Sequence, residues 1–69
     1  MSQKIREKLA KNSIFLRAVK GLKREELSLI LGFDNSYISK LEKGKINITI
    51  DKLEIISNYF DIDTYKLLK

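Results

Sequence analysis

Apolar residues recur along the chain at the spacing of α-helices. Ile5, Leu9 and Leu16 follow one another at intervals of four and seven residues, which predicts a first helix over about residues 3–20. The only stretch with a strand-like composition is Asn47–Ile50, which is too short to build a sheet. The pattern therefore favours an all-α fold.

Two shorter helices are predicted in the middle of the chain. One covers about residues 24–31, and the next opens at Asp34, a residue type that commonly caps helices, and runs to about residue 43. Their predicted inward-facing residues are Leu27, Ile30 and Leu31 in the first and Ile38 and Leu41 in the second.

Two more helices are predicted in the last third of the chain. Thr49 is a candidate N-cap for a helix that ends near residue 60, with Leu53, Ile56 and Phe60 on its inner face, and Asp63 caps a short helix over residues 64–68. A glycine ends each of the first three helical stretches, as expected for a residue that tolerates the left-handed conformation; these are Gly21, Gly32 and Gly44. We therefore predict one all-α domain of five short helices over residues 1–69.

The composition excludes several kinds of chemistry. The 69 residues include no cysteine and no histidine, which removes disulfides, thiolate or imidazole zinc sites, and cysteine or histidine catalysis. The carboxylates are scattered and no glycine-rich phosphate loop is present, so we expect neither an enzyme nor a cofactor. No apolar run resembles a membrane span or a secretory signal, which predicts a cytoplasmic protein.

Positive charge is concentrated at the start of the chain. The formal net charge is +5, but residues 1–24 contain eight Lys or Arg and one acid, a net of +7, whereas residues 25–46 and 47–69 each carry a net of −1. A one-sided basic field suits a polyanion such as nucleic acid. Two other interpretations are a solvated lysine face and a basic amphipathic helix over residues 3–20 that binds anionic membranes.

Residues 24–43 have the layout of a helix-turn-helix unit. Two short predicted helices are separated by a tight break at Gly32-Phe33. In DNA-binding versions of this unit, the second helix lies in the major groove and its N-terminal residues contact base edges. The second helix here exposes small amides, hydroxyls and lysine, which suit such contacts.

The sequence resembles the Cro/lambda-repressor-like helix-turn-helix family, of the xenobiotic-response-element type. The resemblance covers about residues 9–69 and is carried by Leu16–Leu27, Gly32–Gly44 and Asp51–Ile62. Tyr37–Ser39 followed by Asn47–Ile50 is most similar to the small controller proteins of restriction–modification systems. Phage and plasmid repressors share most of these positions.

The resemblance implies roles for individual residues. The family's base-reading positions are occupied by Asn35, Ser36, Ser39 and Lys40. Asparagine can pair with adenine, serine can donate or accept a hydrogen bond, and lysine can reach guanine or a phosphate. We therefore expect Asn35 and Lys40 to contribute most to base recognition. The positions that contact the DNA backbone are occupied by Arg24, Tyr37, Lys43, Lys45 and Asn47. The ring of Tyr37 could also meet a thymine methyl.

Arg17 and Glu42 match a structural pair that, in the family, links the first helix to the end of the recognition helix.

Two positions depart from the family pattern. Lys23 stands where serine or threonine caps the second helix, which predicts that the capping box with Glu26 is lost. Ser13 stands where an aliphatic core residue is usual, which leaves the packing of the first helix around it open.

A chain of this size commonly gains stability from disulfides, a metal or a partner subunit, and here only the last is open. The last two predicted helices place four apolar or aromatic residues off the main core stripe: Ile55, Tyr59, Ile62 and Tyr65. Either a small core wraps around them or they form a homodimer interface. A symmetric dimer would present two recognition helices about 34 Å apart to an inverted repeat.

The predicted function is a sequence-specific DNA-binding transcriptional regulator that contacts the major groove of double-stranded DNA. The resemblance implies control of a restriction–modification operon, including its own promoter. Alternatives are a phage- or plasmid-type repressor and an antitoxin-like protein-interaction module that autoregulates. The chain stops at Lys69, directly after the fifth predicted helix, which argues against a toxin-binding extension. RNA polymerase stays open as a further partner.

Overall fold

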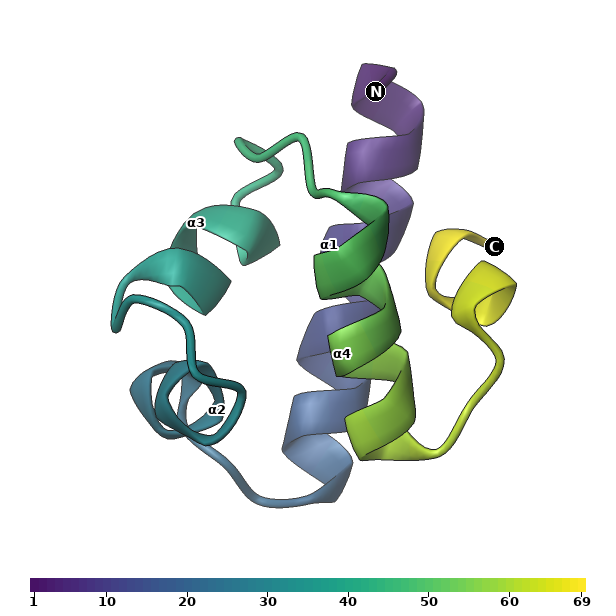
Figure 1. Ribbon diagram of the computed structural model, residues 1–69. Helices are drawn as coiled ribbons and strands as arrows, with labels where there is room; N and C mark the ends of the chain where they lie inside the picture. Colours follow the sequence, from purple (N-terminus) through teal and green to yellow (C-terminus); the bar gives the residue numbers. More distant parts are fainter.

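The computed structural model describes residues 1–69 as a small bundle of helices without strands. The elements are α1 (Gln3–Val19), α2 (Arg24–Ile30), α3 (Tyr37–Glu42), α4 (Ile50–Phe60) and a final 3₁₀ helix, η1 (Thr64–Leu68). In Figure 1, α1 stands in the middle, α2 and α3 lie on one side of it, and η1 lies on the other. The all-α prediction is confirmed, with four α-helices and one 3₁₀ helix in place of five α-helices.

Nine buried side chains from every element form the core. They are Leu9, Leu27, Ile38, Leu41, Ile48, Leu53, Ile56, Phe60 and Leu67. Seven of these were assigned to the core by helical spacing. Leu67 of η1 and Ile48 were not; Ile48 lies in the loop between α3 and α4, outside any helical repeat. Its burial anchors that loop to the domain.

Two predicted inward-facing residues are exposed. Ile5 lies near the start of α1, where the helix extends beyond the rest of the bundle (Figure 1), and it is only partly covered, at 38% exposed. Ile30 is the last residue of a helix of seven residues, and Leu27 and Leu31 already cover the core side of that helix. Helical spacing predicted which face of each helix is turned toward the core. It could not predict how far along each helix the neighbouring elements reach and cover that face.

Every α-helix ends in the same hydrogen-bonded turn. After α3, the Gly44 N–H donates to the Leu41 carbonyl (3.0 Å) and the Lys45 N–H to the Lys40 carbonyl (3.2 Å), which is the Schellman arrangement. The turn requires a positive φ, which Gly44 adopts at 71°. After α4 the same position is held by Asp61, the only non-glycine residue with a positive φ (55°).

We expect Asp61→Gly to stabilise the protein. A side chain in the left-handed region clashes with its own backbone, and glycine removes that clash. The expected gain in the free energy of unfolding is about 0.5–1 kcal/mol, measured by urea unfolding. Asp63→Gly is the matched control, because Asp63 has an ordinary φ of −68°, and it should give no gain. Equal effects of the two variants would contradict the explanation.

The helix caps show that the predicted loss of the capping box at α2 is only partly correct. The Thr49 hydroxyl accepts a hydrogen bond from the Lys52 N–H (3.2 Å), as expected for the N-cap of α4. At α2, the Glu26 carboxylate accepts from the Lys23 backbone N–H (2.8 Å), so half of the capping box is present. The other half is missing because a lysine ammonium group has no lone pair with which to accept.

Candidate DNA-binding surface

α2 and α3 form the helix-turn-helix unit that the sequence predicts. The buried Ser28 hydroxyl of α2 accepts a hydrogen bond from the Ile38 backbone N–H (3.1 Å), which satisfies a free donor in the first turn of α3. Phe33 in the turn packs against Tyr37, with ring centroids 4.8 Å apart. Ser28 was not singled out from the sequence, since a lone serine among apolar residues gives no signal of its partner.

The recognition helix is shorter than predicted. The prediction placed its start at Asp34, but α3 begins at Tyr37, and the preceding residues form a turn closed by a hydrogen bond from the Tyr37 N–H to the Asp34 carbonyl (2.9 Å). Asn35 and Ser36 therefore lie in this turn, whereas Ser39 and Lys40 lie on the helix. Asn35 and Lys40 are exposed, and the two serines are half-buried.

Four of the predicted DNA contacts lie together. A solvent-open hollow between the start of α2 and the start of α3 is lined without any hydrophobic residue by Arg24, Glu25, Asn35, Ser36 and Ser39. The structure thus brings one predicted backbone contact beside three predicted base-reading residues. Lys40 does not line this hollow.

The Ser36 side chain has a defined hydrogen-bond direction. Its hydroxyl donates to the Asp34 carboxylate (2.7 Å), and this bond is the main reason that the pKa of Asp34 lies below its ordinary value. Backbone N–H groups and Lys40 act in the same direction. Because the hydroxyl proton is used, Ser36 presents lone pairs toward solvent and acts as an acceptor.

Tyr37 is half-buried and packs within the protein. The Lys52 ammonium lies 4.5 Å from the centre of its ring, a cation–π contact that links α4 to α3. Burial raises the pKa of the Tyr37 hydroxyl above its ordinary value. The ring is therefore part of the protein's packing, and contacts of Tyr37 with DNA stay a prediction.

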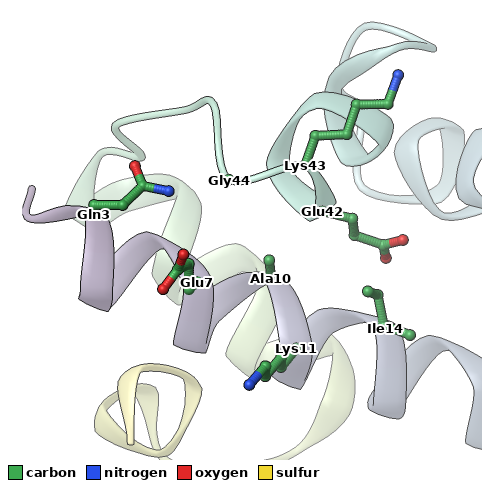
Figure 2. A pocket seen from close by; sticks show the side chains of 8 residues that line it. All are labelled: Gln3, Glu7, Ala10, Lys11, Ile14, Glu42, Lys43 and Gly44. Atoms are coloured by element: carbon green, nitrogen blue, oxygen red, sulfur yellow. The ribbon is translucent and has the colours of Figure 1, made fainter.

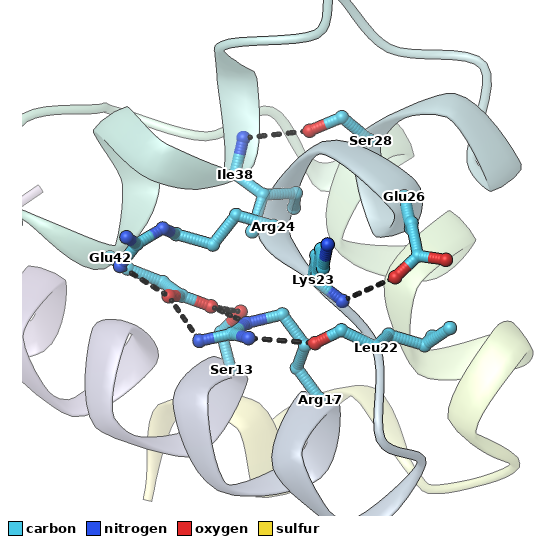
Figure 3. A network of polar contacts seen from close by, with 9 residues as sticks. All are labelled: Ser13, Arg17, Leu22, Lys23, Arg24, Glu26, Ser28, Ile38 and Glu42. Atoms are coloured by element: carbon cyan, nitrogen blue, oxygen red, sulfur yellow. Dashed lines mark hydrogen bonds and ion pairs between the residues drawn. The ribbon is translucent and has the colours of Figure 1, made fainter.

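Arg17 and Glu42 meet in a polar network beneath the recognition helix (Figure 3). Arg17 Nε donates to Glu42 Oε2 (3.0 Å) and Nη2 donates to Oε1 (3.1 Å), which is a bidentate pair. The Ser13 hydroxyl also donates to Oε2 (3.1 Å), and Arg17 Nη1 donates to the Leu22 carbonyl (2.7 Å). The Glu42 side chain is only 2% exposed and the Arg17 side chain 17%.

This network explains the departure from the family pattern at Ser13 and also includes Arg24. Ser13 is fully buried like the aliphatic residue it replaces, and its hydroxyl is satisfied by Glu42. Arg24 Nη1 approaches Glu42 Oε1 at 4.0 Å, so the arginine links the start of α2 to the end of α3. The Arg24 side chain is 56% exposed and remains accessible to a ligand.

The loop between α3 and α4 carries the other predicted backbone contacts. Lys43, Lys45 and Asn47 are all exposed. The Asn47 side chain is held by Arg6 of α1, whose Nη1 donates to Asn47 Oδ1 (2.6 Å). Arg6 was counted only as part of the basic N-terminal charge, because its partner lies 41 residues away in the sequence.

The residues predicted for a dimer interface are spread over the C-terminal elements. Ile55 is 41% exposed and Tyr65 is 59% exposed. Tyr59 and Ile62 are half-buried against the core, and the Lys20 ammonium lies 4.8 Å from the centre of the Tyr59 ring. Tyr59 and Ile62 therefore pack partly against the core, as the alternative to a dimer interface predicts.

No group of three or more Asp, Glu, Cys or His side chains is arranged to hold a metal ion. None of the helices combines the length and the apolar character needed to cross a membrane.

The fold and the polar surface of α2 and α3 define a helix-turn-helix protein. Residues 16–67 match the sequence profile of the family described as "Helix-turn-helix". The chain therefore belongs to the helix-turn-helix family. This membership confirms the family resemblance predicted from the sequence.

One known protein of similar sequence is named as a transcription factor. The chain is 33% identical over 66 residues to "Neisseria hypothetical transcription factor" from Neisseria meningitidis serogroup B. The match covers 96% of this chain and 62% of the length of that relative.

Two crystal structures have a similar fold. One is that of the hypothetical transcription factor NHTF from Neisseria, with a TM-score of 0.89, 30% identity, and coverage of 100% of this chain and 80% of that chain. The other is that of the restriction-modification controller protein C.AhdI from Aeromonas hydrophila, with a TM-score of 0.80, 29% identity, and coverage of 90% and 94%.

Proposed function

We propose that this protein is a sequence-specific transcriptional regulator that reads double-stranded DNA through the major groove. The observation that carries the proposal is the hollow lined by Arg24, Glu25, Asn35, Ser36 and Ser39. It joins a basic side chain at the start of one helix to amide and hydroxyl groups at the start of the next. The first suits a phosphate and the others suit base edges.

We further propose that the protein acts as a cytoplasmic homodimer on an inverted repeat and controls a restriction–modification operon that includes its own promoter. The resemblance to the controller protein C.AhdI supports the choice of operon. The exposed Ile55 and Tyr65 support the dimer, because a second copy would cover them. A promoter-bound dimer would also be placed to contact RNA polymerase.

Selection from a random pool of duplex DNA at about 0.15 M salt, a typical physiological ionic strength, tests the proposal. Enrichment of an inverted repeat with half-sites about one helical turn apart would support it. Retention of DNA without enrichment would contradict sequence-specific binding and would favour the protein-interaction alternative. A test of the operon is whether the protein changes expression from the promoter that carries the selected repeat.

Two substitutions are expected to separate base reading from backbone binding. Asn35→Ala should weaken binding to the best site by about 1–3 kcal/mol and relax the sequence preference. Lys45→Ala should weaken all sequences alike and lower the slope of log K against log salt by about one. Titrations of labelled duplexes at several salt concentrations measure both quantities. If the two variants behave identically, the division of roles between these residues is wrong.

A further inference from the structure

The first turn of α1 is tied to the loop between α3 and α4 by one side chain. Arg6 Nη1 donates to the Asn47 Oδ1 atom (2.6 Å) and to the Met1 carbonyl (2.8 Å), and Nη2 donates to Gln3 Oε1 (3.0 Å). The guanidinium group is therefore held by Gln3 of its own helix and by Met1 ahead of it, and it extends to Asn47. The loop that it reaches carries three predicted contacts to the DNA backbone.

The rest of the loop is fixed at its two ends. At one end, the turn at Gly44 lies close to α1, because Gln3 Nε2 is 3.7 Å from where a Cβ atom would lie on that glycine. Figure 2 shows Gln3 directed from α1 toward this loop across the cleft between them. At the other end, Ile48 is buried in the core and Thr49 caps α4. Asn47 lies between these anchors, and Arg6 is its hydrogen-bond partner.

The chemistry of the guanidinium group sets the orientation of the Asn47 amide. Arginine has only donors, so the atom that faces Arg6 must be the amide oxygen. The Nδ2 group, which has two N–H donors, is then left for another partner. A DNA phosphate is an acceptor only, so this orientation suits a phosphate, whereas the opposite orientation would present an oxygen to it.

We propose that Arg6 is a positioning residue that presets Asn47 as a hydrogen-bond donor to a DNA phosphate. This inference rests on the proposed function, since it needs a DNA backbone beside the loop. Arg6 acts through Asn47 and does not itself contact the phosphate. Because phosphate contacts do not depend on sequence, a labelled duplex of mixed sequence is a sufficient probe.

A double-mutant cycle on the full chain tests the proposal. Asn47→Ala should weaken binding to the mixed-sequence duplex about tenfold, the usual effect of losing one hydrogen bond to a charged group. Arg6→Ala should weaken it about threefold to tenfold, because the amide then spends only part of its time in the productive orientation. Arg6→Ala in the Asn47→Ala background should have no further effect beyond that of the control variant below.

Lys8→Ala is the control for the loss of charge. Lys8 is an exposed residue of α1 whose side chain forms no hydrogen bond or ion pair, so the variant removes one positive charge from the same helix and leaves the loop intact. Its effect on affinity is to be subtracted from that of Arg6→Ala. If Lys8→Ala weakens binding as much as Arg6→Ala does, charge alone accounts for the effect and the proposal is overturned.

Asn47→Asp separates positioning from simple support of the fold. The carboxylate can still accept from Arg6, so the thermal unfolding temperature should not fall, but it has no donor and repels phosphate. Binding should therefore be lost to at least the extent seen for Asn47→Ala. Retained binding by Asn47→Asp would overturn the proposal.

Two other outcomes are distinguishable. Additive effects of the two alanine substitutions, together with a salt slope lowered by about one in Arg6→Ala, would show that Arg6 contacts a phosphate itself and would overturn the proposal. If the unsubstituted protein does not bind the duplex at low salt, the proposed function fails before the cycle is begun.

Discussion

Replacement of Glu42 by alanine is expected to lower the free energy of unfolding by about 3–5 kcal/mol, the usual cost of removing one partner from a buried ion pair. The substitution leaves Arg17 and the Ser13 hydroxyl without their shared acceptor in a site that is nearly closed to water. A domain of 69 residues has a total stability of about 3–10 kcal/mol at typical values per residue. A loss of this size is a large share of the total, so the variant should unfold at a much lower urea concentration than the unsubstituted protein, as measured by circular dichroism.

Loss of DNA binding should follow in the Glu42→Ala variant even though Glu42 itself is buried away from solvent. Arg24→Ala is the informative control, since Arg24 is the exposed partner of the same carboxylate at 4.0 Å. Exposed ion pairs contribute about 0–1 kcal/mol, so Arg24→Ala should fold normally and still weaken DNA binding. If Glu42→Ala unfolds at the same urea concentration as Arg24→Ala, the buried pair has no special role in stability.

The network around Glu42 shows what could and could not be predicted from the sequence. The Arg17–Glu42 pair was expected because it matches a pair in the family, and the structure places the two side chains in contact. The roles of Ser13 and Arg24 in the same network were not expected, because Ser13 stands where an aliphatic residue is usual and Arg24 was assigned only as a DNA-backbone contact. Their contacts depend on three-dimensional distances that no local pattern encodes.

The helices likewise have features that local sequence predicts and features that it does not. Periodicity and capping residues gave the order and type of the helices, because both depend on residues near each other in the chain. The start of the recognition helix was placed three residues too early, since Asp34 caps a single turn ahead of α3 instead of the helix itself. The difference matters for function, because it places Asn35 and Ser36 on a turn in which the Asp34 carboxylate accepts a hydrogen bond from the Ser36 hydroxyl.

The candidate DNA-binding residues were found by position in the family pattern, whereas the residues that hold them were not. Ser28 supports the start of α3, and Arg6 supports the loop after it. Both act through partners distant in sequence, at separations of 10 and 41 residues. A supporting residue of this kind has no fixed spacing from the residue that it supports, so only the structure reveals it.

Substitution of Ile55 by glutamate is expected to produce a monomer and to weaken binding to the full inverted repeat by about 10²–10⁴-fold. The expectation follows from the proposed homodimer, in which binding of the first subunit holds the second beside its half-site at a high effective concentration. Ile55 is 41% exposed, so a charged side chain can reach water in the monomer and the fold should be retained. In a symmetric dimer the substitution would bring two like charges together at the interface.

Val19→Glu is the matched control for this experiment. Val19 is also β-branched, is 70% exposed near the end of α1, and lies outside the proposed interface, while the change in charge is the same. Sedimentation equilibrium measures the association state, and titrations with a full repeat and with a single half-site measure binding. The Ile55→Glu variant should lose affinity for the full repeat but bind the half-site as the unsubstituted protein does. Equal loss on both duplexes would mean that Ile55 supports the DNA-binding surface, and an unchanged dimer would place the interface elsewhere on the molecule.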